Sequence, residues 1–353
     1  MMASATIWVL GLTLSWFDPG DEAGGGLKRF EFAETHMGSE FKIVLYSVDE
    51  PTARRASRSA YGRIAALDAA FSDYQPDSEL MRLCDRAGGP PIRVSDDLLD
   101  ILQRSRAMYE KSAGAFDVTV GPVVRLWRRA RRDRKMPAPD LLERARALVS
   151  TDLMVIDPKA KTVQLRKPGM KLDLGAIAKG YASQAAVDTL RGLGIGRALV
   201  AGAGDIVVSG PPPGRDGWVI GIAPLEAPNA PPSTWLSLHD AAVSTAGDSE
   251  RYVVIDGRRY SHIVDPRTGL GIVDRSSVTV VARDGATADA LDTAVYAMGT
   301  ERGLPLVESI EGAAAHIARA TASGITVLES RRFRSIPRAD PAHSGEPSAH
   351  LKP

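Results

Sequence analysis

The chain has 353 residues, of which 44% are hydrophobic and 25% charged, a composition typical of a globular protein of enzyme size. Lys and Arg number 44 and Asp and Glu 43, so the net charge of +1 provides no overall field that favours nucleic acid or an anionic membrane as a partner. The single cysteine, Cys84, excludes an intramolecular disulfide, a cysteine-rich zinc site and an iron–sulfur cluster. We interpret Cys84 as a buried or incidental thiol rather than a nucleophile.

The two ends of the sequence differ in composition from the part between them. Residues 1–26 form an apolar leader and a glycine linker, and the apolar run Ile7–Phe17 is too short to span a bilayer. Its length suits a signal-peptide core, but no Lys or Arg precedes it and no clear cleavage site follows, so we expect either a degenerate export signal or a disordered leader. Export would place the protein in the periplasm or on the outer face of the cytoplasmic membrane, and any membrane association would go through this leader.

The Pro/Ser/Ala-rich tail 334–353 shows no apolar period and is expected to be disordered, which leaves 27–333 as the folded domain. Within it, helices are predicted where apolar residues recur with a helical period: 52–71, a helix capped by Ser95, 140–149, 177–193, 288–299 and 301–310. Strands are predicted at 29–35, 41–48, 153–157, 162–166, 197–201, 205–209, 218–222, 235–238, 251–255, 258–264, 276–283, 313–318 and 325–328.

Hairpins outnumber strand–helix–strand crossovers in this order, so we predict an α+β fold of mixed, mostly antiparallel sheets with packed helices. The glycine-rich stretch 191–205 follows a helix and enters a strand, whereas a dinucleotide-binding loop follows a strand and opens a helix, so a Rossmann site is disfavoured. The basic stretch 125–140 is predicted to be a solvated surface excursion, because no aromatic residues alternate with its charges as in a nucleic-acid site.

Three oxygen-bearing side chains share one face of the helix predicted at 288–299. Asp289, Asp292 and Thr293 stand at i, i+3 and i+4, and carboxylates with a hydroxyl are ligands that Mg²⁺ accepts. The alternative is that acidic residues at a helix start complement the helix dipole while Thr293 bonds the local backbone. Taken alone, the three residues favour this alternative.

Three further stretches carry residue types suited to ligand binding. In "KLDLGAIAKGYA", 171–182, Lys179 offers a charge for a phosphate and Asp173 offers a hydrogen-bond acceptor, while the glycines allow the backbone to approach a ligand closely. The alternative is a strand that runs into a helix with a solvated lysine. In "RRYSHIVDPRTGLGI", 258–272, His262 precedes a Pro-and-Gly turn, although a lone histidine is more often structural. Tyr74 could stack on a planar ligand or cover the core edge, and Phe116-Asp117 suits a pocket wall or a strand entry.

Taken in order, the motifs "MGS", "FSDYQPDSEL", "GAFDVTVGP", "LDLGAIAKGYA", "VSTAGDSERY", "YSHIVDPRTG" and "ADALDTA" resemble the ApbE family of FAD:protein FMN transferases from about residue 30 to 330. The resemblance implies a T-fold-type arrangement and an enzyme that takes FAD and Mg²⁺. Such an enzyme joins FMN through a phosphoester to a Thr or Ser of an acceptor protein, here expected in a redox or electron-transport chain, and releases AMP.

The resemblance also assigns residues. It implies that Mg²⁺ is held by Asp289, Asp292, Thr293 and the backbone carbonyl of Ala176, and it places the histidine of the family motif at His262. We take His262 as the candidate base that deprotonates the acceptor hydroxyl, because the unperturbed pKa of histidine, about 6.5, lies near working pH. The implied FAD contacts are Met37, Tyr74, Ala115, Phe116, Asp117, Asp173, Lys179 and Val264.

The sequence departs from the family pattern at two places. Ala203 stands where the family usually has a glycine, and no cysteine near the N-terminus offers the lipoprotein anchor of many exported members. Three rival functions stay open: a Mg²⁺-dependent FAD pyrophosphatase, a non-catalytic FAD-binding protein, and self-modification at Thr287 of "DGAT". For Thr287 a role at the helix start is favoured.

Overall fold

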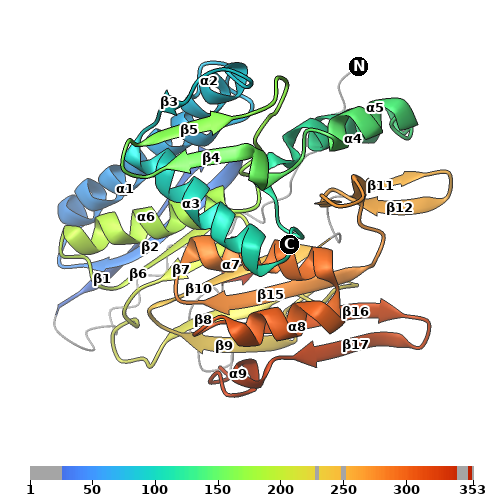
Figure 1. Cartoon of the computed structure of the whole chain (residues 1–353). Helices are drawn as coiled ribbons and strands as arrows, with labels where there is room; N and C mark the ends of the chain where they lie inside the picture. The colour runs from blue at the N-terminus through green and yellow to red at the C-terminus, as the bar shows by residue number, and fades with distance from the viewer. Residues whose placement is uncertain (1–25, 227–229, 248–251, 340–348, 352–353) are drawn as a thin grey trace, which may run out of the picture.

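The computed structural model describes residues 26–226, 230–247, 252–339 and 349–351 (Figure 1). Its centre is an eight-stranded sheet in the order β1-β2-β6-β7-β10-β15-β16-β17, and each neighbouring pair in it is antiparallel. The bounds of these strands are β1 Lys28–His36, β2 Ser39–Ser47, β6 Ala198–Gly202, β7 Asp205–Val208, β10 Ala241–Gly247, β15 Ser276–Ala282, β16 Ala314–Thr321 and β17 Gly324–Glu329.

Smaller sheets and helices surround this sheet. The three-stranded sheets contain β3 Ile92–Arg93, β5 Thr162–Leu165 and β4 Met154–Asp157, and β18 Ala349–Leu351, β8 Trp218–Ile222 and β9 Thr234–Leu238; the two-stranded ones contain β11 Tyr252–Ile255 with β12 Arg258–Ser261, and β13 Val264–Asp265 with β14 Leu270–Gly271. The helices are α1 Glu50–Phe71, α2 Glu79–Asp85, α3 Asp96–Lys111, α4 Gly121–Asp133, α5 Pro139–Arg146, α6 Ala178–Gly192, α7 Gly285–Met298, α8 Thr300–Ser309 and α9 Arg331–Arg334, with 3₁₀ turns η1 Val118–Val120 and η2 Thr151–Leu153.

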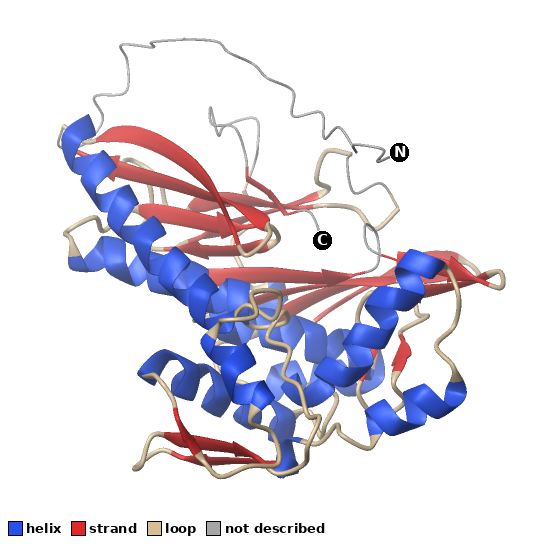
Figure 2. Ribbon diagram, turned by 90° about the horizontal axis from the view of Figure 1, so that it is seen from above, coloured by secondary structure: helices blue, strands red, loops and turns tan. Residues whose placement is uncertain are grey.

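Both faces of the large sheet are covered, which explains the unbroken apolar runs of its strands. In β2, Ile43 and Leu45 point into the main core under the helices, while Val44 between them packs with Trp218 of the β8–β9 sheet. Helices α1, α6 and α7 contribute residues to this main core, and Figure 2 shows helices gathered on one side of the sheet. The predicted α+β class with mostly antiparallel sheets is therefore confirmed.

The contact between α6 and α7 depends on two glycines. A Cβ atom added to Gly180 would lie 2.1 Å from the carbonyl oxygen of Gly285, and one added to Gly285 would lie 2.1 Å from the oxygen of Gly180. The helices thus cross with their backbones in contact. Gly180, expected from sequence to let the backbone approach a ligand, accommodates the neighbouring helix instead.

A third apolar cluster lies apart from the large sheet. It joins Val123, Trp127 and Ala130 of α4 to Ala145 of α5 and to the inner face of the β11–β12 hairpin. The indole Nε1 of Trp127 donates to the carbonyl oxygen of Gly269 at 2.7 Å, so α4 is fixed to the turn that precedes β14. The stretch 125–140 was predicted to be a solvated surface segment, but it contains most of α4, and one face of that helix is buried.

Most other predicted helices and strands agree with the structure, although the short elements α2, α9, β3 and β14 were not predicted. The strands predicted at 29–35 and 41–48, and those predicted at 153–157 and 162–166, pair as the antiparallel hairpins β1–β2 and β4–β5. Strand β10 was not predicted, and the strand predicted at 258–264 is interrupted by a bend at His262 and Ile263.

The C-terminal tail differs from its predicted disorder over its first residues. The backbone N–H of Ser237 donates to the carbonyl of Pro337 and that of Ala339 to the carbonyl of Trp235, so 335–339 runs along β9. The leader 1–25 lies outside the described residues, and export stays a prediction. Within the described ranges, the structure contains no helix that is long and apolar enough to cross a membrane.

Cys84 is buried in the main core, and its sulfur accepts a hydrogen bond from the N–H of Leu172 at 3.2 Å. Burial raises the pKa of the thiol, which disfavours the reactive thiolate. This confirms that the thiol is buried, as the sequence suggested.

The turn between β6 and β7 holds a non-glycine residue in a left-handed conformation. Ala203 has φ +56°, where an L-residue is strained and glycine is not. We expect Ala203→Gly to raise the free energy of unfolding by about 1 kcal/mol, measured by urea denaturation. The control Ala201→Gly, in the middle of β6, should lower it by about 0.5–1 kcal/mol. A lower stability for Ala203→Gly would contradict this account of the turn.

Candidate active site

Two buried aspartates of α7 face the beginning of α6. Asp289 and Asp292 have exposed fractions of 4% and 1%. The backbone N–H of Gly180 donates to Oδ2 of Asp289 at 2.9 Å, and no side chain of α6 caps its own N-terminus. Asp289 therefore caps α6 from the neighbouring helix, where its negative charge also complements the helix dipole.

A chain of polar contacts links Asp292 to Lys179 of α6. The hydroxyl of Ser244 on β10 lies 2.6 Å from Oδ2 of Asp292 and 2.5 Å from Oδ1 of Asp205 on β7. The other oxygen of Asp205 forms an ion pair with the ammonium of Lys179. Because one hydroxyl has one proton, Ser244 can donate to only one of the two carboxylates at a time.

The cluster has more negative than positive charge. Burial and the charge of Asp205 raise the pKa of Asp289 to about 7, and burial with the charges of Asp289 and Asp205 raises the pKa of Asp292 well above its usual value. Burial alone would lower the pKa of Lys179, but the three carboxylates outweigh it and raise that pKa. With all three carboxyls ionised, the cluster would carry two more negative charges than the single ammonium balances, and this repulsion is part of what raises the pKa values of Asp289 and Asp292.

The donor set fits a divalent cation. Oδ1 of Asp292 is buried and has no hydrogen-bond partner in the described part of the chain, and a buried acceptor in that state favours an ion or a water beside it. Thr293 is half-buried, and its hydroxyl has no hydrogen-bond partner among the described residues; Ala176 lies in the turn before α6. Within the described ranges, no three His, Cys, Asp or Glu side chains form a ready-made metal site, so Mg²⁺ here would depend on two carboxylates, a hydroxyl and a carbonyl.

A second cluster gathers around Arg128 of α4. Its guanidinium donates to Oδ2 of Asp173 at 2.8 Å, pairs with Asp73 and stacks on the ring of Tyr74 at 4.4 Å. Tyr74 is 76% exposed, and burial together with the charge of Asp73 raises the pKa of Asp173. The structure thus brings two predicted ligand contacts, Tyr74 and Asp173, to one arginine.

The predicted contacts at 115–117 have structural partners. The carboxylate of Asp117 accepts hydrogen bonds from the N–H and hydroxyl groups of both Thr119 and Thr151. Ala115 and Phe116 are buried, Phe116 within the main core. Asp117 therefore fixes the entry into η1, and a role for these residues in binding FAD stays a prediction.

The remaining predicted residues lie on separate elements. Met37 is in the β1–β2 turn with φ +50°, and its N–H donates to Asp68 of α1 at 2.9 Å. Val264 is buried in the cluster that holds Trp127. His262 is half-buried in the bend that separates β12 from β13.

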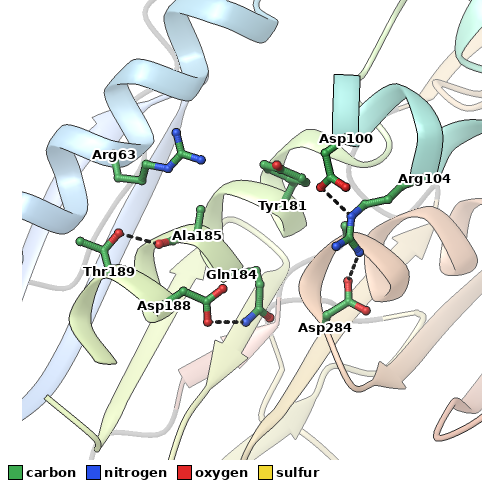
Figure 3. A pocket seen from close by; sticks show the side chains of 10 residues that line it. Arg63, Asp100, Arg104, Tyr181, Gln184, Ala185, Asp188, Thr189 and Asp284 are labelled. Atoms are coloured by element: carbon green, nitrogen blue, oxygen red, sulfur yellow. Dashed lines mark hydrogen bonds and ion pairs between the residues drawn. The ribbon is translucent and has the colours of Figure 1, made fainter. Parts of the chain in front are cut away.

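A polar hollow of about 450 Å³ lies elsewhere, between α1, α3, α6 and the start of α7 (Figure 3). None of the predicted site residues lines it. Its arginines already have partners, because Arg104 bridges Asp100 and Asp284 and Arg63 pairs with Asp97. This hollow offers no spare charge to a ligand, so we do not assign the chemistry to it.

The sequence model that describes the ApbE family matches residues 37–317 of this chain, a range that includes both clusters and His262. The chain belongs to the ApbE family. It is 32% identical to an FAD:protein FMN transferase of Treponema pallidum over 332 residues, covering 88% of this chain and 91% of the relative. A Klebsiella pneumoniae protein of the same name is 32% identical over 276 residues, covering 78% and 84%.

Solved structures agree with this family assignment. The flavin transferase ApbE from Vibrio cholerae matches with a TM-score of 0.80 at 28% identity, covering 88% of this chain and all of that one. The apo flavinyl transferase ApbE of Pseudomonas stutzeri matches with a TM-score of 0.78 at 29% identity, covering 88% and 97%. The ApbE-like fold is thus confirmed across nearly all of the described residues.

Sequence reasoning missed three residues that complete the two clusters: Asp205, Ser244 and Arg128. Ser244 lies on the strand that was not predicted. Arg128 could have been found from the apolar spacing of Val123, Trp127 and Ala130, which turns Arg128 toward the edge of the buried face.

Proposed function

We propose that this ApbE-family enzyme transfers the FMN part of FAD to a Thr or Ser hydroxyl of an acceptor protein, in a Mg²⁺-dependent reaction that releases AMP. Its relatives are named as enzymes that transfer FMN from FAD to protein. The Mg²⁺ ion, the Thr or Ser acceptor and the AMP leaving group are what we propose beyond that name. The observation that carries them is the buried cluster of Asp205, Asp289 and Asp292, in which three carboxyl groups share one ammonium and Oδ1 of Asp292 has no hydrogen-bond partner among the described residues, a donor set that suits a divalent cation.

Each cluster has a part in this proposal. Asp289, Asp292, Thr293 and the carbonyl of Ala176 would hold Mg²⁺, which when bound neutralises charge on the pyrophosphate and on the departing AMP. Lys179, kept charged by its carboxylate neighbours, would hold a phosphate oxygen. The exposed ring of Tyr74, stacked on Arg128, would contact a planar ring of FAD.

The bond changes balance as a displacement at phosphorus. The acceptor oxygen attacks the FMN-side phosphorus, and the bond from that phosphorus to the bridging oxygen breaks. AMP leaves with the bonding electron pair, while His262 takes the proton of the hydroxyl. The product carries FMN through a phosphoester.

Intact-mass spectrometry of acceptor candidates from the same genome, co-expressed with the enzyme, tests the function. We expect one acceptor to gain the mass of FMN less one water. In a parallel reaction of purified enzyme, FAD and Mg²⁺, FMN should stay protein-bound when that acceptor is present. Release of free FMN and AMP at the same rate with and without acceptor would instead establish an FAD pyrophosphatase, and tight FAD binding without AMP release a binding protein.

Self-modification at Thr287 is the least supported rival. The hydroxyl of Thr287 donates to Oδ2 of Asp284 at 2.6 Å, and its N–H donates to the other oxygen of that residue. Thr287 lies within α7, whose N-terminus Asp284 caps. These contacts support the helix-start role over a modified hydroxyl.

A further inference from the structure

The outer side of α4 carries an unusual concentration of positive charge. Residues 121–136 contain seven basic side chains and one acidic one, whereas the whole chain has a net charge of +1. The apolar side chains Val123, Trp127 and Ala130 face inward. We call the exposed basic residues that form no salt bridge within the described ranges the α4 basic surface: Arg125, Arg129, Arg131, Arg134 and Lys135; Arg132 is exposed too but pairs with Asp133.

The charges of this surface do not hold the fold together. Arg129, Arg131, Arg134 and Lys135 form no ion pair with any described residue, and the guanidinium of Arg125 donates to the sulfur of Met81 at 3.5 Å. Like charges one helical turn apart, such as Arg125 and Arg129, repel each other. A surface of this kind gains free energy when an anionic partner covers it.

The helix that carries this surface also contacts both halves of the candidate site. Arg128 reaches Asp173 and Tyr74 on one side, and Trp127 donates to Gly269 in the segment that carries His262. A molecule seated on the outer side of α4 therefore lies next to the elements on which we place flavin binding and proton transfer. In Figure 1, α4 and α5 lie beside the β11–β12 hairpin, away from α1.

We propose that the α4 basic surface docks an acidic segment of the acceptor protein and thereby presents its Thr or Ser hydroxyl to the site. This inference rests on the proposed function, because it assumes that a protein acceptor must approach the flavin. Docking through unpaired arginines would speed association and make it sensitive to salt.

The helix is not built to bind the two other common polyanions. A helix that lies on a membrane needs an exposed apolar face, and the apolar side of α4 is buried against α5 and β11–β12. Single-stranded nucleic acid is bound by exposed rings that alternate with basic residues. Trp127, the aromatic residue of α4, is 2% exposed, and the exposed ring of Tyr74 stacks on Arg128, which is not part of the α4 basic surface. An acidic protein segment needs neither feature.

Binding of two labelled peptides to the full chain tests this proposal without FAD. One peptide has a single Thr among Asp and Glu residues, and the other has Asn and Gln in their place. We expect the wild type to bind the acidic peptide at least about tenfold more tightly at low salt, a preference that high salt removes. Arg129→Glu with Arg131→Glu should abolish the preference, and the Gln pair should reduce it.

The matched control reverses two exposed arginines of α1, Arg55→Glu with Arg58→Glu, and should keep the full preference. Equal thermal unfolding midpoints of all variants would show that the fold is retained. An equal affinity of the wild type for both peptides, or a preference that survives in the Arg129/Arg131 variant, would overturn the proposal.

Two further arms separate this proposal from its neighbours. In the first, the protein is sedimented with phosphatidylserine-containing vesicles. If the wild type binds these vesicles through the same arginines and shows no preference between the two peptides, the surface is a membrane site and the acidic-segment proposal is overturned. In the second, FAD and Mg²⁺ are added to the wild type with peptide bound, so that transfer of FMN is measured separately from peptide binding. Peptide preference without any transfer to a protein acceptor would count against the proposed function, and transfer without peptide preference against the docking surface.

Discussion

Asp289→Asn is expected to lower FMN transfer at least about 100-fold while leaving the fold intact. Mutation even of the outer residues that hydrogen-bond to metal ligands lowers metal affinity or activity about 10- to 100-fold. The amide oxygen of Asn can still accept from the N–H of Gly180, so the cap of α6 is kept while the charge is lost. Transfer is measured by intact mass of the acceptor. Mg²⁺ should raise the thermal midpoint of the wild type but not that of the variant.

Asp289→Ala separates the two roles of the side chain. It should lose transfer to the same extent and, in addition, about 1 kcal/mol of stability through the lost helix cap. Asp188→Asn is the matched control, since Asp188 lies on α6 and its side chain is 55% exposed; it should change neither transfer nor the response to Mg²⁺. Full transfer by Asp289→Asn would remove this residue from the metal site.

The order of helices and strands was largely predictable because burial on both faces leaves a strong apolar signal. Strand β15 has seven consecutive buried residues, and the core-facing residues of α1 recur with a helical period. Strand β10 gave no such signal: "AAVSTAG" consists mostly of small residues, whose strand conformation follows from pairing with β7 and β15. Ser244 was missed for that reason.

The pairings within the site required the three-dimensional register. Asp205 stands directly after the β6–β7 turn, and only the pairing of β7 with β10 brings it to the same hydroxyl as Asp292. The i, i+3 spacing placed Asp289 and Asp292 on one face of a helix, as predicted. It did not show that Asp289 caps a different helix, because that contact depends on the close crossing at Gly180 and Gly285.

His262→Ala is expected to lower the rate constant for transfer about 10²- to 10⁴-fold without weakening FAD binding, the range typical of a lost general base. The structure holds the backbone around this residue on both sides. Ser261 donates through its N–H to Ile272 at 2.7 Å, and Ile272 donates to Ile263 at 3.0 Å, so the bend between β12 and β13 is fixed against β14. A side chain on such a fixed bend is suited to position a proton acceptor.

The measurement that distinguishes a base from a positioning residue is the dependence of transfer on pH. If His262 accepts the proton, the wild-type rate should rise with pH, and His262→Ala should lose that rise while FAD and Mg²⁺ still bind. His239→Ala is the control, since His239 is 60% exposed on the loop after β9. Unchanged turnover of His262→Ala at saturating FAD would exclude it as the base. A slow variant that keeps the wild-type pH profile would instead assign His262 to positioning the acceptor, with the hydroxyl losing its proton to solvent.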